Sequence, residues 1–243
     1  MIVDEKPSFV RQLLAARRRS RANFLLGKVL INSPMKVVDI GCGIDGRSFS
    51  DFVPENWDVT GVDVLPSEAV HHAHPRFTYL QQDAQDLSRF DDTAFDLAVS
   101  IGVLEHITDE LQLGRVVSEI RRIATQYAVV VPYRYCWIEP HYGVPFFPVL
   151  PRPVQAAIVR TLNLNRHRDA VKRDPRFIQK YYHWPSNGQY QALFPEAAIH
   201  LLPTREMIAI VRSARNGAHQ PAADPRGEDH DHHPRQHPPL HRG

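Results

Sequence analysis

The chain has 243 residues, of which 43% are hydrophobic, and its 29 basic and 27 acidic residues give a formal net charge of +2 with neutral histidine. This length and hydrophobic content suit one α/β domain with a full core. No uninterrupted apolar run approaches the ~20 residues that cross a bilayer, and residues 1–20 lack the apolar centre of a secretory signal, so we expect a cytoplasmic protein. The two cysteines, Cys42 and Cys136, form neither a disulfide framework nor a metal-binding pattern, and we expect no metal site.

Hydrophobic periodicity predicts helices and strands along most of the chain. Apolar residues recur at helical spacing in residues 8–30 and 109–124. Five apolar runs have strand character, at residues 36–40, 58–64, 77–81, 95–100 and 127–131. The first of these strands is expected to lead into a helix that begins near Gly46. Towards the end, residues 198–202 and 207–212 flank a Pro-Thr-Arg-Glu turn and predict a closing hairpin.

The turn after the first strand carries the strongest functional signal. The strand runs into Gly41 and Gly43, which have no Cβ, so backbone N–H groups there can approach a ligand closely. Asp63 lies twenty positions after Gly43, at the end of the second strand, where a carboxylate can accept hydrogen bonds from both hydroxyls of a ribose. A tight turn that binds nothing is the alternative interpretation of this pattern alone.

Three further motifs follow in order and narrow the interpretation. Asp39 lies two residues before the first glycine, Asp83 follows the third strand, and the fourth strand leads into Ile-Gly-Val-Leu-Glu-His-Ile. With these motifs, residues 35–132 resemble the class I S-adenosylmethionine-dependent methyltransferases that modify small molecules or lipids. One departure is that Ile44 and Asp45 precede Gly46, where the family commonly has a glycine two positions after its second glycine.

The resemblance implies a fold, a cofactor and a set of contacts. The fold would be α/β, with a doubly wound, Rossmann-like, seven-stranded sheet that is mostly parallel and has one antiparallel strand in a C-terminal hairpin. The cofactor would be S-adenosylmethionine, its amino group oriented by Asp39, its ribose held by Asp63 and its adenine amino group held by Asp83. The complete set of implied cofactor-binding residues is Asp39, Gly41, Cys42, Gly43, Asp63, Asp83, Ala84, Ser100 and Ile101.

The segment after the fifth strand is expected to recognise the methyl acceptor. It begins with a run that is unusually rich in aromatic residues and proline, and long loops in compact domains are usually functional. We expect an acceptor pocket there, although these side chains could instead simply cover the sheet edge. The candidate acceptor-binding residues are Tyr133, Arg134, Trp137, Glu139 and Tyr142. His106 and His141 are the candidate general bases, and each has a structural role as its alternative.

Charge is unevenly distributed along the chain. Residues 37–112 hold fifteen acidic residues and three arginines, whereas residues 1–36 hold eight basic and two acidic residues. An acidic half suits a sulfonium cation, and the basic segments favour an anionic acceptor or peripheral contact with an anionic membrane, unless they are simply solvated helix faces.

These observations lead to one expected function and two alternatives. We expect residues 1–217 to form a single methyltransferase domain, with a helical arm at 1–34 and an acceptor-side insertion at 133–196, followed by a disordered tail rich in histidine and proline at 218–243. The domain would methylate a small-molecule or lipid-linked acceptor at oxygen. Nucleic acid is not the expected partner, because the fourth strand lacks an Asn/Asp-Pro-Pro-aromatic run. An RNA methyltransferase with a basic arm and a non-catalytic cofactor-binding scaffold remain the alternatives.

Overall fold

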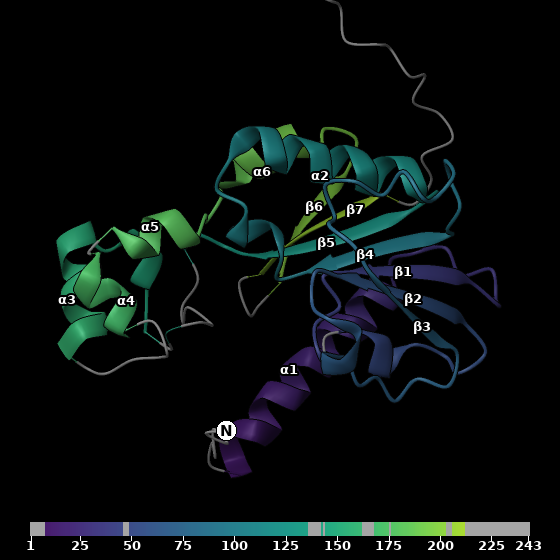
Figure 1. The fold of residues 1–243 in the computed structure, drawn as a ribbon, viewed down its shortest axis with the longest axis horizontal. Coiled ribbons are helices and arrows are strands. Elements are labelled where there is room, and N and C mark those ends of the chain that lie inside the picture. Colours follow the sequence, from purple (N-terminus) through teal and green to yellow (C-terminus); the bar gives the residue numbers. More distant parts are fainter. Residues whose placement is uncertain are drawn as a thin grey trace, which may run out of the picture.

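A computed structural model describes residues 8–45, 49–135, 142, 144–161, 168–174, 176–202 and 206–211. Its centre is a seven-stranded sheet in the order β3-β2-β1-β4-β5-β7-β6 (Figure 1). The strands are β1 (Lys36–Ile40), β2 (Asp58–Asp63), β3 (Phe77–Gln81), β4 (Leu97–Ile101), β5 (Tyr127–Pro132), β6 (Ala198–Leu201) and β7 (Glu206–Val211). Strands β1 to β5 pair in parallel, and β7 runs antiparallel to both β5 and β6. The predicted fold class, with one antiparallel strand in a C-terminal hairpin, is confirmed.

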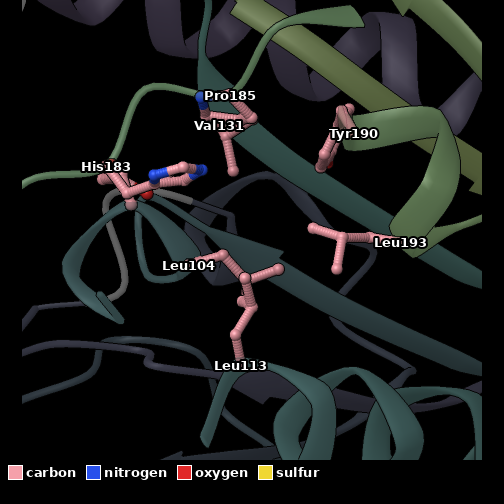
Figure 2. A pocket seen from close by; sticks show the side chains of 8 residues that line it. Leu104, Leu113, Val131, His183, Pro185, Tyr190 and Leu193 are labelled. Atoms are coloured by element: carbon pink, nitrogen blue, oxygen red, sulfur yellow. The ribbon is translucent and has the colours of Figure 1, made fainter. Parts of the chain in front are cut away.

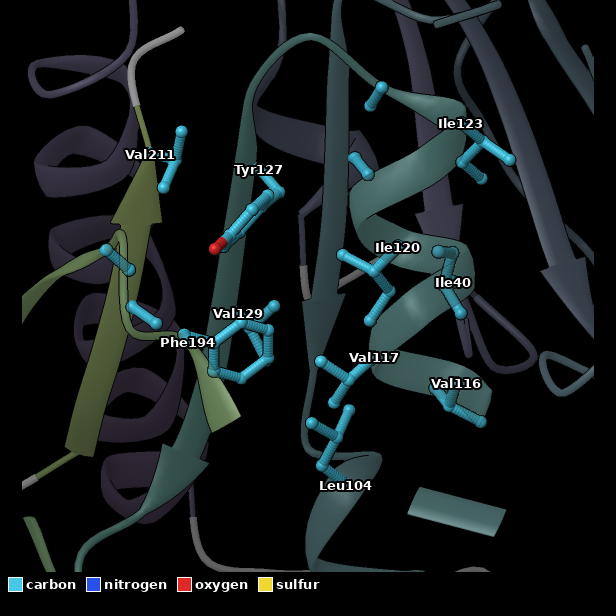
Figure 3. Packing of buried hydrophobic residues seen from close by; sticks show 14 of the residues in the cluster. Ile40, Leu104, Val116, Val117, Ile120, Ile123, Tyr127, Val129, Phe194 and Val211 are labelled. Atoms are coloured by element: carbon cyan, nitrogen blue, oxygen red, sulfur yellow. The ribbon is translucent and has the colours of Figure 1, made fainter. Parts of the chain in front are cut away.

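Helices cover both faces of this sheet. On one face, α2 (Glu110–Ile123) and α6 (Asn187–Leu193) lie over a buried cluster that includes Ile40, Ile120 and Phe194 (Figure 3). On the other face, α1 (Ser8–Leu26) packs against a second cluster through Leu25. Every residue of β5 and β7 is buried, as expected for strands covered on both sides. The central strands are therefore packed on both faces, and the candidate site residues lie at the strand ends and in the loops that follow them.

The crossover from β1 to β2 differs from the expected helix. Residues 46–48 lie outside the described part of the chain, and residues 49–57 contain only a 3₁₀ turn, η1 (Ser50–Phe52), as helical structure. Pro54 follows this turn directly after Val53, whose extended conformation is the one that a following proline favours. The prediction of a helix is therefore wrong for the described residues of this crossover.

A separate group of short helices lies beyond the carboxyl ends of β4 and β5 (Figure 1). We call the described residues between 142 and 182 the helical cap; they include η4 (Phe147–Val149), α3 (Arg152–Thr161), α4 (Arg168–Arg173) and α5 (Phe177–Tyr181). The cap has its own buried cluster, made of Tyr142, Phe147, Ala156, Val159, Val171, Ile178 and Tyr182. It is thus a small packed unit within the segment in which the sequence predicts acceptor recognition.

Membrane-spanning helices and clustered metal ligands are both absent from the described residues. None of the described helices is long and apolar enough to cross a membrane. No group of three or more His, Cys, Asp or Glu side chains in the described ranges could hold a metal ion. Residues 218–243, for which the sequence predicts a disordered tail, lie outside the described part.

Candidate functional site

The glycine turn after β1 meets the loop after β4 at the carboxyl edge of the sheet. Gly41, Gly43 and Gly102 all have positive φ, of 73°, 69° and 75°. A Cβ on Gly41 would lie 2.2 Å from Cγ2 of Val103, so only glycine allows this close approach. A Cβ on Gly43 would meet no atom within 4 Å. Gly43 therefore borders open space into which a ligand can fit.

Asp63, at the end of β2, lies directly beside this turn. Its Oδ2 accepts a hydrogen bond from the Gly43 amide at 2.9 Å, and its Oδ1 accepts one from the Leu65 amide at 3.2 Å. Tyr79 donates its hydroxyl proton to the carbonyl oxygens of Asp63 and Leu65, at 3.0 and 2.5 Å. The structure thus brings together the acid and the glycine that the sequence pairs across twenty positions.

Asp39 lies beneath the turn and is almost completely buried. Its Oδ2 accepts a hydrogen bond from the Ser50 hydroxyl at 2.9 Å. Burial raises the pKa of Asp39 to about 6, and the charge of Asp63 acts in the same direction, while the Ser50 hydrogen bond and the charge of Arg21 oppose them. A cation bound nearby would favour the ionised carboxylate.

The remaining cofactor candidates line the same edge. Asp83 is exposed after β3, and its carboxylate accepts hydrogen bonds from the Gln85 backbone and side chain at 2.9 and 3.1 Å. Ala84 is half-buried beside it, and Ile101 is half-buried at the end of β4. Cys42 is buried, close to the position that a Cβ on Gly61 would take.

Ser100 is the candidate with an unsatisfied polar atom. It is 1% exposed, and its hydroxyl has no hydrogen-bond partner among the described residues. Since buried polar groups are normally paired, this hydroxyl is suited to a ligand at the carboxyl end of β4.

The structure describes only some of the candidate acceptor-binding residues. Tyr133 packs partly against the sheet cluster, its ring 5.4 Å from that of Tyr135, and Arg134 is exposed. Tyr142 is buried in the helical cap, where its ring stacks on Phe147 at 4.5 Å. The structure therefore gives Tyr142 a packing contact, and its contact with an acceptor stays a prediction. Trp137, Glu139 and His141 lie outside the described residues.

His106 lies where the helical cap joins the sheet. It ends the 3₁₀ turn η3 (Leu104–His106), and its ring centroid lies 5.3 Å from that of Tyr181 and 5.0 Å from that of Tyr182. Nearby, the Thr108 hydroxyl donates a hydrogen bond to the carbonyl of Lys180 at 3.1 Å. His106 is exposed, so it can contact the cap and still reach solvent or a ligand.

Two residues beside this junction were not among the sequence candidates. His183 donates its backbone N–H to the carbonyl of Glu105 at 2.6 Å, and the Glu105 side chain is buried. Both line a small pocket of about 10 Å³ at the ends of β4 and β5 (Figure 2). Its lining consists of Leu104, Glu105, Leu113, Val131, His183, Pro185, Tyr190 and Leu193. Two features of the sequence could have indicated these residues. Glu105 is next to the candidate base His106, and His183 lies within an aromatic run.

The electrostatics of His183 favour a neutral imidazole. Burial lowers its pKa, the charge of Arg134 lowers it further, and the charge of Glu110 opposes both. A neutral imidazole ring can accept a proton, so His183 adds a third histidine to the two candidate bases.

The strand order, the glycine turn and the acid after β2 together define the class I methyltransferase fold. Comparison with known proteins agrees. Residues 38–131 match the methyltransferase domain family. Over 100 residues the chain is 31% identical to the cyclopropane-fatty-acyl-phospholipid synthase of Escherichia coli (strain K12), an alignment that covers 39% of this chain and 25% of that protein. The chain thus spans about a quarter of the length of the curated relatives it matches.

Two solved structures have similar folds. One is the 1,6-didemethyltoxoflavin-N1-methyltransferase of Burkholderia thailandensis with bound 1,6-didemethyltoxoflavin and S-adenosylhomocysteine, at 14% identity and a TM-score of 0.51, covering 86% of this chain and 82% of that chain. The other is an O-methyltransferase family protein of the same organism, at 11% identity and a TM-score of 0.51, covering 82% of this chain and 57% of that chain. At these identities the likeness shows the fold alone.

Residues 38–131 are a class I S-adenosylmethionine-dependent methyltransferase domain, and its cofactor is S-adenosylmethionine. The site fits this cofactor in three respects: open space beside Gly43, an acid at the end of β2, and a buried Ser100 hydroxyl with no partner in the described chain.

Proposed function

We propose that the chain transfers a methyl group from S-adenosylmethionine to an oxygen atom of a small-molecule or lipid-linked acceptor. The observation that carries this proposal is the position of the helical cap, joined to the loop after β4 beside the cofactor turn. The pocket at that junction is small, about 10 Å³, and its lining combines apolar side chains with Glu105 and His183, polar groups of the kind that can orient a ligand. The name of the E. coli relative, which refers to fatty acyl phospholipids, adds weak support for a lipid-linked acceptor.

In this proposal the cofactor is held by groups from four strand ends. Asp63 would accept from the ribose hydroxyls, Asp83 from the adenine amino group, and Asp39 would orient the amino group of the methionine part. The backbone of Gly41 and Gly43 would pass beside that part, and the Ser100 hydroxyl would contact the bound ligand. When bound, S-adenosylmethionine supplies a methyl group that is already activated on a sulfonium sulfur.

The protein then has to align the acceptor oxygen and remove its proton. Alignment would come from the junction between η3 and the helical cap. Three histidines are candidates for the base. His183 is half-buried in the pocket, His106 contacts the cap tyrosines, and His141 lies outside the described residues.

The proposal is tested by finding the labelled product. The full chain is incubated with methyl-labelled S-adenosylmethionine and cell extract, and the extract is then separated into organic-soluble, small aqueous and RNA fractions for mass spectrometry. We expect label in the organic or small aqueous fraction, and less of it with Asp63→Ala when the cofactor concentration is limiting. Label confined to RNA would favour the RNA methyltransferase, and no label in any fraction would favour the scaffold.

His183→Gln and His106→Gln distinguish the candidate bases. Loss of a general base typically lowers the rate 10²- to 10⁴-fold while cofactor affinity is kept. If both variants keep the wild-type rate, neither histidine acts as the base.

A further inference from the structure

A proline-rich turn of the helical cap exposes apolar side chains to solvent. We call residues 145–154 the apolar turn; in it, Phe146, Val149 and Val154 are 39%, 40% and 42% exposed. Exposed single apolar residues are ordinary, but here three of them fall within nine positions of one turn. They belong to the unit that we propose to hold the acceptor.

The shape of the apolar turn is fixed from beneath. Phe147 and Pro148 are buried, and the Gln155 side-chain amide donates hydrogen bonds to the carbonyls of Phe147 and Leu150 at 2.9 and 3.1 Å. The Val149 amide donates to the carbonyl of Phe146 at 3.1 Å. The exposed side chains are therefore presented by an ordered backbone, which lowers the entropy cost of binding a partner.

The helical cap that carries this turn is rich in basic side chains. The described cap residues include six basic side chains, Arg152, Arg160, Lys172, Arg173, Arg176 and Lys180, and two acidic ones, Asp169 and Asp174. Lys172 lies 3.8 Å from Asp169, and Lys180 lies 2.6 Å from Asp174, so these pairs partly neutralise each other. The cap keeps a net positive charge, carried by its arginines.

The basic helix α1 projects from the same end of the sheet (Figure 1). Arg17 and Arg21 anchor it to Glu206 at 3.1 and 2.9 Å, and Glu206 pairs with Pro132 at the carboxyl end of β5. Arg18 and Arg19 lie between these two anchors and are partly or fully exposed. The exposed arginines of α1 are thus held near the carboxyl end of β5, the strand after which the chain leads to the helical cap.

We propose that the apolar turn, together with the basic residues of the helical cap and of α1, docks this protein on an anionic lipid bilayer. Phe146, Val149 and Val154 would enter the interface between headgroups and acyl chains, and the arginines would contact anionic headgroups. The charge of the cap and of α1 favours this occupant over a neutral apolar partner. Docking itself does not depend on the proposed function. Only its purpose, which is direct access to a lipid-linked acceptor, rests on that proposal.

The test is flotation of the full chain with vesicles, without cofactor, so that it is independent of methyl transfer. Vesicles of equal parts phosphatidylglycerol and phosphatidylcholine are compared with vesicles of phosphatidylcholine alone, at low and high salt. We expect at least tenfold more protein bound to the anionic vesicles, with the difference shrinking at high salt because surface charge is screened over ~8 to 10 Å. Equal binding to both vesicles, or no binding to either, would overturn the proposal.

Variants separate the apolar and the basic contributions. The triple variant Phe146→Asn, Val149→Ser, Val154→Ser should lower binding at least tenfold; Asn is chosen because it tolerates the left-handed conformation of Phe146, with φ of 53°. Val149→Ser alone should lower binding severalfold and changes one exposed side chain, so its result does not depend on the folding of the triple variant. Arg18→Gln with Arg19→Gln should lower binding mainly at low salt, and it leaves the Arg17 anchor in place.

Matched controls come from exposed leucines elsewhere. Leu111→Ser on α2, where the side chain is 76% exposed, and Leu201→Ser on β6 should leave vesicle binding unchanged. If these controls lose as much binding as the triple variant, the apolar turn is not the docking surface. If vesicles bind as expected but no acceptor is labelled, the docking inference stands and the proposed function fails.

Discussion

At the scale of single residues, the cofactor edge is organised by two carboxylates in different environments. Asp63 is half-buried and uses both oxygens on backbone amides, yet an ionised carboxylate has about four acceptor sites, so it can still accept from hydroxyls. Asp39 is buried with one hydroxyl donor, and its ionisation is costly. The first carboxylate is suited to recognition by hydrogen bonds, and the second to sensing the charge of a ligand.

The environment of Asp39 predicts a pH dependence of stability. Its folded pKa of about 6 lies above the ordinary value, so the stability that it contributes is fully present below about pH 4 and is lost as pH rises through 6. A shift of about two pKa units corresponds to about 3 kcal/mol. In urea unfolding from pH 4.5 to 7.5, Asp39→Asn should therefore gain stability relative to the wild type as pH rises. A difference between the two proteins that does not change with pH would contradict this account.

The same carboxylate should couple pH to cofactor binding in the opposite direction. If the amino group of the cofactor lies near Asp39, its positive charge favours the ionised form, and affinity for S-adenosylhomocysteine should rise between pH 5 and 7. Asp39→Asn should flatten this rise.

At the scale of elements, α1 depends on a buried ionic contact. Arg21 and Glu206 are both buried, and burial lowers the pKa of Arg21 while Glu206 raises it. Arg17 contacts the same carboxylate oxygen of Glu206. This arrangement fixes α1 against the start of β7, beside the carboxyl end of β5.

Removing one partner of this contact should be costly. Glu206→Ala leaves the Arg21 guanidinium buried without its carboxylate and should lower the free energy of unfolding by about 3 to 5 kcal/mol, measured by urea denaturation. The double variant Arg21→Leu, Glu206→Leu should lose less, because no buried charge is left. As a control, Asp58→Ala breaks the half-exposed pair with Arg76 and should cost about 1 kcal/mol or less. Equal losses for Glu206→Ala and Asp58→Ala would show that burial does not strengthen the α1 contact.

At the scale of the whole molecule, the elements that depend on local sequence patterns were predicted correctly. The strands were predicted to within two residues at each end, and the central strands β1, β4 and β5 were clearest because parallel strands buried on both faces are nearly continuous apolar runs. Helix α2 was found because Leu113, Val117 and Ile120 repeat at helical spacing and Asp109 caps it, its Oδ1 accepting from the Gln112 amide at 2.9 Å. The pairing of Gly43 with Asp63 followed from motif spacing.

Structure that depends on long-range contacts was not predictable from the sequence. The helical cap consists of short helices interrupted by prolines, and its cluster joins residues as distant as Tyr142 and Tyr182, so no periodic pattern indicated it. The role of Val103 in excluding a side chain at Gly41, and the backbone contact between His183 and Glu105, are likewise visible only in three dimensions. Sequence therefore predicted that Gly43 and Asp63 lie together, but it did not predict the contacts within the helical cap or between the cap and the loop after β4.

The central claim is that the whole chain binds S-adenosylmethionine through the edge formed by the glycine turn and Asp63. Isothermal titration calorimetry of the full chain with S-adenosylhomocysteine tests it most directly. We predict binding that Asp63→Ala weakens tenfold to a hundredfold, since charge-assisted hydrogen bonds contribute about 1.5 to 3 kcal/mol, while Asp58→Ala at the other end of β2 leaves affinity unchanged. Absence of binding, unchanged affinity in Asp63→Ala, or tighter binding of a nicotinamide dinucleotide would contradict the account.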